Sequence, residues 1–147
     1  MVLAFTIALT KNTAMFKNNR TKLIAILAVV PFLIFATMQS ELAGITSAIK
    51  SGDSKSLATY FDNTVEVKIA NKEGAYSKSQ AEAVVKDFFT KNPPKDFSFL
   101  HEGTSGGSNG HYAIGSLSTD KGKFRTYVYM KKRADKFYIQ ELSFENE

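Results

Sequence analysis

The sequence predicts an α+β domain with a cone-like shape. A curved antiparallel sheet, made of a four-strand C-terminal meander and one earlier strand, wraps around a long helix, and two short helices precede it. Two observations carry this prediction. Residues 81–89 repeat their apolar positions with the period of a helix, and every segment after Pro94 is patterned as a strand. The length of 147 residues fits one such domain.

An apolar run precedes the domain. Residues 23–36 read LIAILAVVPFLIFA and follow Lys17, Arg20 and Lys22, which is the arrangement of a signal peptide. The run is shorter than the roughly 20 residues of a membrane-spanning helix, and it contains Pro31, which weakens a continuous helix. A signal peptide is therefore favoured over a membrane anchor.

The leader divides the chain into two parts. We expect residues 1–40 to be a signal peptide or, if they are not removed, an N-terminal hydrophobic anchor, and residues 41–147 to be one exported domain, periplasmic or secreted. Met15 is an alternative start of the chain. Every cleavage position between Ala36 and Ala43 stays open, because no clean signal of small residues marks one.

Two short helices and a strand are predicted at the start of the domain. Apolar residues recur at helical spacing from Leu42 to Ile49, and Asp53 is placed to cap a second helix. Apolar and charged residues alternate in residues 64–70, as in a strand with one face in water. We expect residues 71–74 to form the turn that follows.

The long helix is predicted from a cap and a stripe. Ser77 and Gln80 form a capping-box pair, and Pro93 and Pro94 end the helix because proline cannot continue the hydrogen-bond ladder. The apolar stripe follows the spacing i, i+3, i+4, i+7, i+8. It consists of Ala81, Val84, Val85, Phe88 and Phe89.

Four strands are predicted after this helix, at residues 97–102, 111–119, 124–132 and 137–144. In the last strand Phe137 and Ile139 differ in parity from Leu142 and Phe144, so we predict a bulge near residues 140–141 that keeps all four inward. Because bulges curve sheets, we expect a concave end, and a pocket would form there.

Charge and composition narrow the function classes. The formal net charge is +5, but residues 1–37 hold four basic residues and no acidic one, which leaves 15 basic and 14 acidic residues for the rest. A nucleic-acid-binding domain normally keeps a basic surface, so we expect no nucleic acid partner. The absence of cysteine excludes disulfides, thiolate nucleophiles and Cys-ligated zinc. We expect membrane contact only through the apolar run.

Several segments resemble a known family. The segments are ITSAIKSGD at 45–53, Leu57 with Tyr60-Phe61, VEVKI at 65–69, HEG at 101–103, YAIG at 112–115, FRTYVY at 124–129 and YIQEL at 138–142. Together with the order of elements, they resemble the nuclear transport factor two superfamily, also called cystatin-like. More narrowly, residues 41–146 resemble a family of small exported bacterial proteins of unknown function with that fold.

The resemblance implies a cone with an open pocket at its mouth and frequent dimerisation through the outer face of the sheet. The superfamily contains isomerases, dehydratases, ligand binders and non-catalytic assembly modules, so the resemblance supports the fold better than any activity.

Six residues are candidates for lining the expected pocket. Aromatic side chains supply most of an apolar ligand site, and the two histidines flank the glycine-rich segment 103–110. The candidates are Phe61, Phe88, Phe89, Tyr112, His101 and His111. The glycine-rich segment lacks the spacing of a phosphate-binding loop, so we predict a hairpin loop.

The histidines raise the question of catalysis. Simple hairpin register places His111 opposite Glu102 and His101 opposite Tyr112. A functional His–Glu pair or a metal site would need convergent ligands, and a solvated cross-strand pair is the commoner arrangement. We therefore predict no catalytic residue, no metal and no cofactor.

The third strand of the meander suggests an interface. Arg125, Tyr127 and Tyr129 share one face of this strand, and tyrosine and arginine are enriched at protein interfaces. An ordinary amphipathic exterior is the commoner explanation of such a face, and a homodimer through the outer face of the sheet is the alternative.

Three functions stay open at this point. The favoured one is a non-catalytic binding or interaction module with a pocket for a small apolar ligand or a partner segment. The alternatives are a small enzyme of isomerase or hydrolase type that uses a pocket histidine, and a structural subunit of an envelope assembly.

Overall fold

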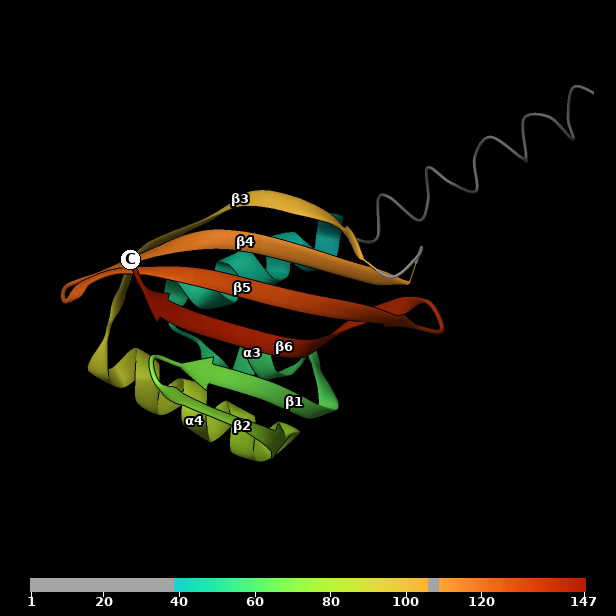
Figure 1. The fold of residues 1–147 in the computed structure, drawn as a ribbon, viewed down its shortest axis with the longest axis horizontal. Helices are drawn as coiled ribbons and strands as arrows, with labels where there is room; N and C mark the ends of the chain where they lie inside the picture. Colours follow the sequence, from blue (N-terminus) through green and yellow to red (C-terminus); the bar gives the residue numbers. More distant parts are fainter. Residues whose placement is uncertain (1–38, 106–108) are drawn as a thin grey trace, which may run out of the picture. The chain divides into compact units, whose positions relative to one another are not determined.

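The computed structural model describes residues 39–105 and 109–147. Contacts divide the chain into Met1–Thr37 and Met38–Glu147, and the second unit is a curved, unclosed sheet with helices on one face (Figure 1). The apolar run at 23–36 and the centre of the glycine-rich loop lie outside the described residues. Of the helices in the described ranges, none is both long enough and apolar enough to cross a membrane.

The six strands form one sheet in the order β2-β1-β6-β5-β4-β3. Neighbouring strands are antiparallel except β1 and β6, which are parallel. The last four strands make the predicted meander, and the earlier strand lies beside the last one. The strands are β1 (Phe61–Ile69), β2 (Lys72–Ser77), β3 (Pro94–Ser105), β4 (Gly110–Thr119), β5 (Gly122–Arg133) and β6 (Lys136–Asn146).

One strand was not expected from the sequence. The segment 71–74, predicted as a turn, belongs mostly to β2, which pairs with β1 as a hairpin. Ile69 pairs with Lys72, so the connection is only Ala70 and Asn71, and Ala70 adopts a left-handed backbone with φ of 52°. The prediction was wrong because β2 carries few inward apolar residues, and Gly74 weakens its alternation.

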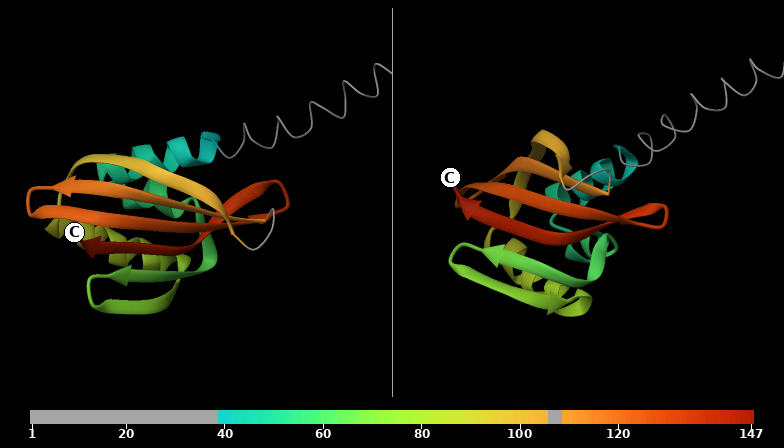
Figure 2. Two further views of the ribbon diagram at one scale, coloured as in Figure 1. Left: turned by 45° about the horizontal axis from the view of Figure 1, so that its top comes forward. Right: turned by 45° about the vertical axis from the view of Figure 1, so that its right-hand side comes forward.

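The helices follow the predicted caps. Residues 39–51 are helical, α3 spans Ser54–Ala58 with Asp53 as its N-cap, and α4 spans Lys78–Lys91. The predicted capping box at α4 is confirmed: Ser77 accepts from the backbone of Gln80, and the Gln80 side chain accepts from the backbone of Ser77. Figure 2 shows the helices together behind the sheet in both further views.

Aromatic residues of α4 join the helix to the sheet. The Phe88 ring stacks on Phe144 of β6 with centroids 4.5 Å apart, and it meets Phe124 of β5 edge-on at 5.1 Å. Phe89 meets the same Phe144 edge-on at 5.8 Å. The predicted stripe is therefore buried, except Val84, which is half-buried at its margin.

The predicted bulge in the last strand is confirmed at Gln140. Tyr129 pairs with Glu141 and Met130 pairs with Ile139, so Gln140 is the extra residue of β6. The register of β1 against β6 also shifts between Ile139 and Glu141 of β6. As a result the two odd-numbered and the two even-numbered apolar residues of this strand are all buried. They are Phe137, Ile139, Leu142 and Phe144.

The buried Asp62 carboxylate ties the bulge to the start of β1. Gln140 donates to Asp62 from its side-chain amide over 3.1 Å, and the Arg133 guanidinium lies 3.0 Å from the same carboxylate. The Asn63 backbone N–H donates to it as well, over 2.7 Å. Asp62 is thus buried with three partners, as a buried carboxylate requires.

A second buried carboxylate ties the first helix to the β5–β6 hairpin. Glu41 accepts a hydrogen bond from the backbone N–H of Phe137 at 3.1 Å. Burial raises the pKa of Glu41, and the hydrogen bond from Phe137, with the charges of Lys136 and Lys132, only partly offsets this rise.

Deletion of Gln140 should abolish the fold, whereas Gln140→Ala should leave it intact. The deletion forces either Phe137 and Ile139 or Leu142 and Phe144 out of the core, at a cost of at least about 4 kcal/mol. The substitution keeps the extra residue and loses one hydrogen bond to Asp62, about 1 kcal/mol. Urea unfolding followed by circular dichroism measures both variants. A deletion variant as stable as Gln140→Ala would contradict this account of the bulge.

Candidate ligand-binding groove

A groove lies between α4 and the hairpin of β1 and β2, with a volume of about 710 Å³. We call it the α4–hairpin groove. Its floor is apolar and comes from both elements, and two of its residues, Val67 and Phe88, belong to the core. The other floor residues, Ile69, Tyr76 and Val84, are half-buried and pack against that core.

The sequence keeps this groove open through small residues. Gly74 faces the groove side of β2, opposite Val67, and the Tyr76 ring lies across it: a Cβ at Gly74 would come within 3.1 Å of that ring. Glycine therefore lets the tyrosine lie flat along the floor. Ala83 of α4 adds only a methyl group to the lining.

One end of the groove is polar. The β1–β2 turn and the C-terminal end of α4 meet there, because α4 runs in the same direction as β1 (Figure 1). The polar lining residues are Asn71, Lys72, Asp87, Lys91 and Asn92. The remaining lining, towards Tyr76 and Val84, is apolar, so the groove has an apolar end and a charged end.

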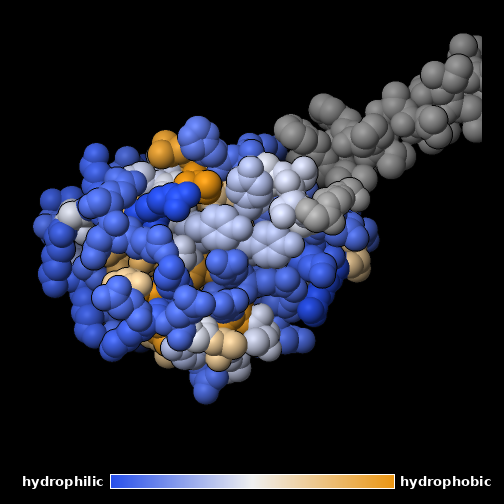
Figure 3. All heavy atoms as spheres, in the orientation of Figure 1, coloured by the Kyte–Doolittle hydropathy of each residue, from blue (hydrophilic) through white to orange (hydrophobic). Residues whose placement is uncertain are grey.

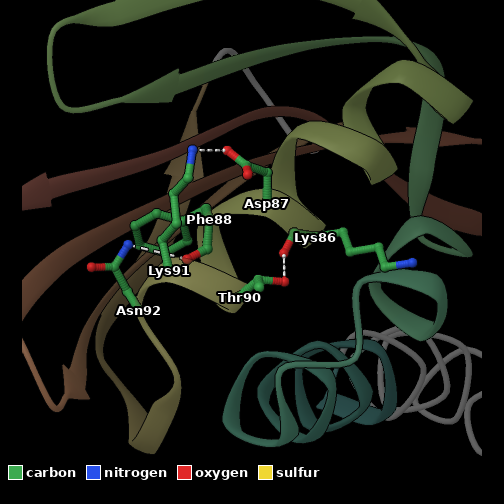
Figure 4. A network of polar contacts seen from close by, with 6 residues as sticks. All are labelled: Lys86, Asp87, Phe88, Thr90, Lys91 and Asn92. Carbon is green, nitrogen blue, oxygen red and sulfur yellow. Dashed lines mark hydrogen bonds and ion pairs between the residues drawn. The ribbon is translucent and has the colours of Figure 1, made fainter.

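The contacts at the end of α4 are shown in Figure 4. The Lys91 ammonium lies 2.6 Å from Asp87, and both side chains are exposed. Asn92 donates to the Phe88 carbonyl twice, from its backbone N–H at 2.8 Å and from its side-chain amide at 3.1 Å. These contacts satisfy an otherwise free carbonyl at the helix end and neutralise Asp87.

A second hollow, of about 550 Å³, is lined mainly by polar residues of α3, α4 and the segment before them. It includes Ser51, Asp53, Ser54, Lys55, Glu82 and Lys86. Ligand sites usually have an apolar lining with a few polar groups, so the α4–hairpin groove is the better candidate.

The six expected pocket residues do not converge. Phe61, Phe88 and Phe89 are buried in the core, and of these only Phe88 also lines the α4–hairpin groove. Tyr112 lies on the outer face of the sheet, since the next residue, Ala113, is buried in the core. His101 is exposed and pairs with Ile114 of the same outer face. Aromatic side chains fill the interior where the pocket was expected.

The predicted pairing of the histidines was wrong. His111 pairs with Thr104, Glu102 pairs with Ala113, and His101 pairs with Ile114. The strands extend further into the loop than simple register assumes, and an extra residue at Leu100 shifts β3.

His111 nevertheless has a defined environment. Its ring meets Phe137 edge-on at 4.9 Å, and burial lowers its pKa, while the nearby Glu102 charge offsets part of this change. His101 is exposed on the other side of the sheet. Within residues 39–105 and 109–147, no three His, Asp or Glu side chains gather as metal ligands.

The predicted interface residues lie together on the outer face of the sheet. We call this surface the tyrosine face and define it as Tyr112, Ile114, Arg125, Tyr127 and Tyr129. The rings of Tyr112 and Tyr127 stack with centroids 6.5 Å apart. Figure 3 shows a pale patch of intermediate hydropathy over β4 and β5, among hydrophilic residues.

Tyr127 is partly desolvated at the centre of the tyrosine face. Burial raises the pKa of its hydroxyl, and the nearby Glu141 charge raises it further. The Tyr112 ring also lies over Gly103 of the neighbouring strand, where a Cβ would come within 2.6 Å of its hydroxyl. Because Gly103 has no side chain, the Tyr112 ring can lie against the backbone of β3.

The family model described as a domain of unknown function, DUF4783, matches residues 42–145. Crystal structures of two DUF4783 family proteins, from Bacteroides ovatus and Bacteroides uniformis, are similar to this chain. Each is 28% identical with a TM-score of 0.68, and the similarity covers 71% of this chain and 94% or 95% of the other. No curated protein matches the sequence.

Two more distant structures agree with the fold. A domain of unknown function with a cystatin-like fold from Nostoc punctiforme is 11% identical, with a TM-score of 0.61 over 76% of this chain and 78% of that one. An NTF-2 like protein of unknown function from Silicibacter pomeroyi is also 11% identical, with a TM-score of 0.57 over 77% and 95%. This chain therefore belongs to the DUF4783 family of domains of unknown function, and its fold is NTF2-like and cystatin-like.

Proposed function

We propose that this chain is an exported, non-catalytic binding module that holds a small apolar ligand in the α4–hairpin groove. The observation that carries the proposal is the apolar floor in a groove of about 710 Å³, a volume typical of small-molecule sites. Ile69, Tyr76 and Val84 are only half-buried there. A ligand that covers them removes apolar surface from water, which favours binding.

The groove favours binding over catalysis. Acid–base catalysis needs a titratable group whose pKa is moved towards neutrality in a desolvated site. The ionisable groups of the lining are Lys72, Tyr76, Asp87 and Lys91, and Asp87 forms an exposed ion pair with Lys91. Neither histidine lines the groove.

The tyrosine face supports a second part of the proposal, a homodimer. Two stacked tyrosines with Ile114 and Arg125 have the composition of an interface core. The tyrosine face and the strands beside it are together self-complementary in charge. Arg125 lies on β5, whereas Glu66 and Glu141 lie on β1 and β6, so two copies related by a two-fold axis can place opposite charges together.

Val84→Trp should weaken the binding of an apolar ligand because the indole fills the groove. We expect the affinity for the neutral dye Nile red to fall at least about tenfold, a loss of about 1.4 kcal/mol. Ala75→Trp is the matched control, since Ala75 lies on the hairpin beside the groove but faces away from it, opposite Glu66. Fluorescence titration of the purified protein measures both. Unchanged affinity in Val84→Trp would exclude this groove as the site.

Tyr127→Glu should convert a dimer into a monomer. The new carboxylate lies at the centre of the tyrosine face beside Glu141, where desolvation and repulsion both oppose association. Ser79→Glu, at an exposed position of α4, is the control. Sedimentation velocity measures the mass, and thermal unfolding checks the fold. A monomeric wild-type protein would contradict the homodimer.

The leader should carry the chain out of the cytoplasm. In a bacterium that expresses the tagged full chain, we expect the protein in the periplasmic or secreted fraction, with an N-terminus between residues 36 and 43 if the leader is removed. Mass spectrometry of the intact protein in each fraction reports both. Accumulation of the uncut chain in the cytoplasm would contradict export.

A further inference from the structure

The distribution of charge in the α4–hairpin groove indicates the class of its ligand. The lining contains two cations, Lys72 and Lys91, and one anion, Asp87. Asp87 is paired with Lys91 at 2.6 Å, and among the described residues Lys72 forms no ion pair. The charged end of the groove therefore has an excess of one positive charge, and that charge is on Lys72.

The neighbouring carboxylates lie on the other face of the hairpin. Lys72 pairs with Ile69 and shares its face, whereas Glu73 pairs with Lys68 on the opposite face. Glu73, Lys68 and Glu145 line an adjoining hollow that meets the groove at Ala70 and Asn71 of the β1–β2 turn. In that hollow Lys68 forms an ion pair with Glu145, so the acidic groups there have a cation of their own.

The C-terminal end of α4 also borders this part of the groove, and helix C-termini carry partial negative charge and disfavour anions. Here the Phe88 carbonyl accepts two hydrogen bonds from Asn92 (Figure 4). These hydrogen bonds reduce the negative potential at this carbonyl. An anion near Lys72 is therefore not opposed by an unsatisfied carbonyl of Phe88.

Resting on the proposed function, we infer that the ligand is a linear amphiphile with one anionic head, a carboxylate on an aliphatic chain. The chain lies along the floor from Ile69 towards Tyr76 and Val84, and the carboxylate lies at the polar end against Lys72. The two rows of apolar side chains, from β1 and from α4, suit an extended chain better than a compact ring system. The single unpaired cation suits one negative charge.

Three ligands that share a decyl-length alkyl chain and differ in their head group test the ligand class. Decanoate, decanol and decyltrimethylammonium are each added below their micelle-forming concentrations to the purified protein with bound Nile red. We expect decanoate to displace the dye at the lowest concentration, decanol at a higher one, and the cation at the highest. Equal displacement by all three, or stronger displacement by the cation, would contradict the inference of an anionic head group. It would not contradict the groove as the binding site.

Variants of Lys72 locate the head group. Lys72→Gln should weaken decanoate about three- to fivefold, the size expected for an exposed charge pair, and leave decanol unchanged. Lys72→Arg should keep the decanoate affinity, and Lys78→Gln, an exposed lysine at the start of α4 outside the groove, is the matched control. Equal affinities in Lys72→Gln and Lys78→Gln would overturn the role of Lys72.

The same titration separates this inference from the proposed function. If Nile red does not bind the wild-type protein and none of the three amphiphiles binds by calorimetry, the proposed function fails together with the inference. If Nile red binds, Val84→Trp weakens it, and the head group makes no difference, only the inference fails.

Discussion

The extra residue at Gln140 is the constraint on which the rest of the domain depends. Strand β6 is paired on both sides, and its register shifts against both partners at this level. Without the bulge, no single face of β6 could bury residues of both parities. The bulge therefore brings Phe137 to the first helix through Glu41, and Phe144 to α4 through Phe88. The buried Asp62 fixes its position.

The α4–hairpin groove is a consequence of how α4 packs. Phe88 and Phe89 reach Phe144 at the centre of the sheet, so the helix lies close to β6 at this point. The hairpin at the sheet edge covers the next face of the helix with Val67, Ile69 and Tyr76, and Gly74 adds no side chain. The space left beside Val84 is the groove. The groove is therefore built from the margin of the core.

The sequence predicted the features that depend on strong local signals. The period of α4 and its capping box, the four strands of the meander and the parity change in the last strand each have a direct physical cause that can be seen in the residues. The hairpin of β2 was missed because its exposed strand has no clear alternation. The parallel pairing of β1 with β6 joins segments far apart in the chain, and no local pattern encodes it.

The candidate site was harder to predict for a related reason. Aromatic residues such as Phe61 and Phe89 look like pocket residues in a sequence, but the same side chains fill a core, and only packing decides between the two. The histidine register failed because β3 and β4 stay paired as far as Ser105 and Gly110, inside a glycine-rich segment that looks like a loop in the sequence. One clue to the groove was present: Val84 belongs to the apolar stripe of α4 but lies at its margin.

The bulge at Leu100 also affects how copies of the domain can meet. Strand β3 is at one edge of the sheet, and a regular free edge offers unpaired backbone groups to a strand of another chain, which leads to aggregation. An extra residue in the middle of β3, with an exposed leucine, breaks the regular spacing of those groups. The irregular spacing thereby protects the sheet against continuous growth from β3.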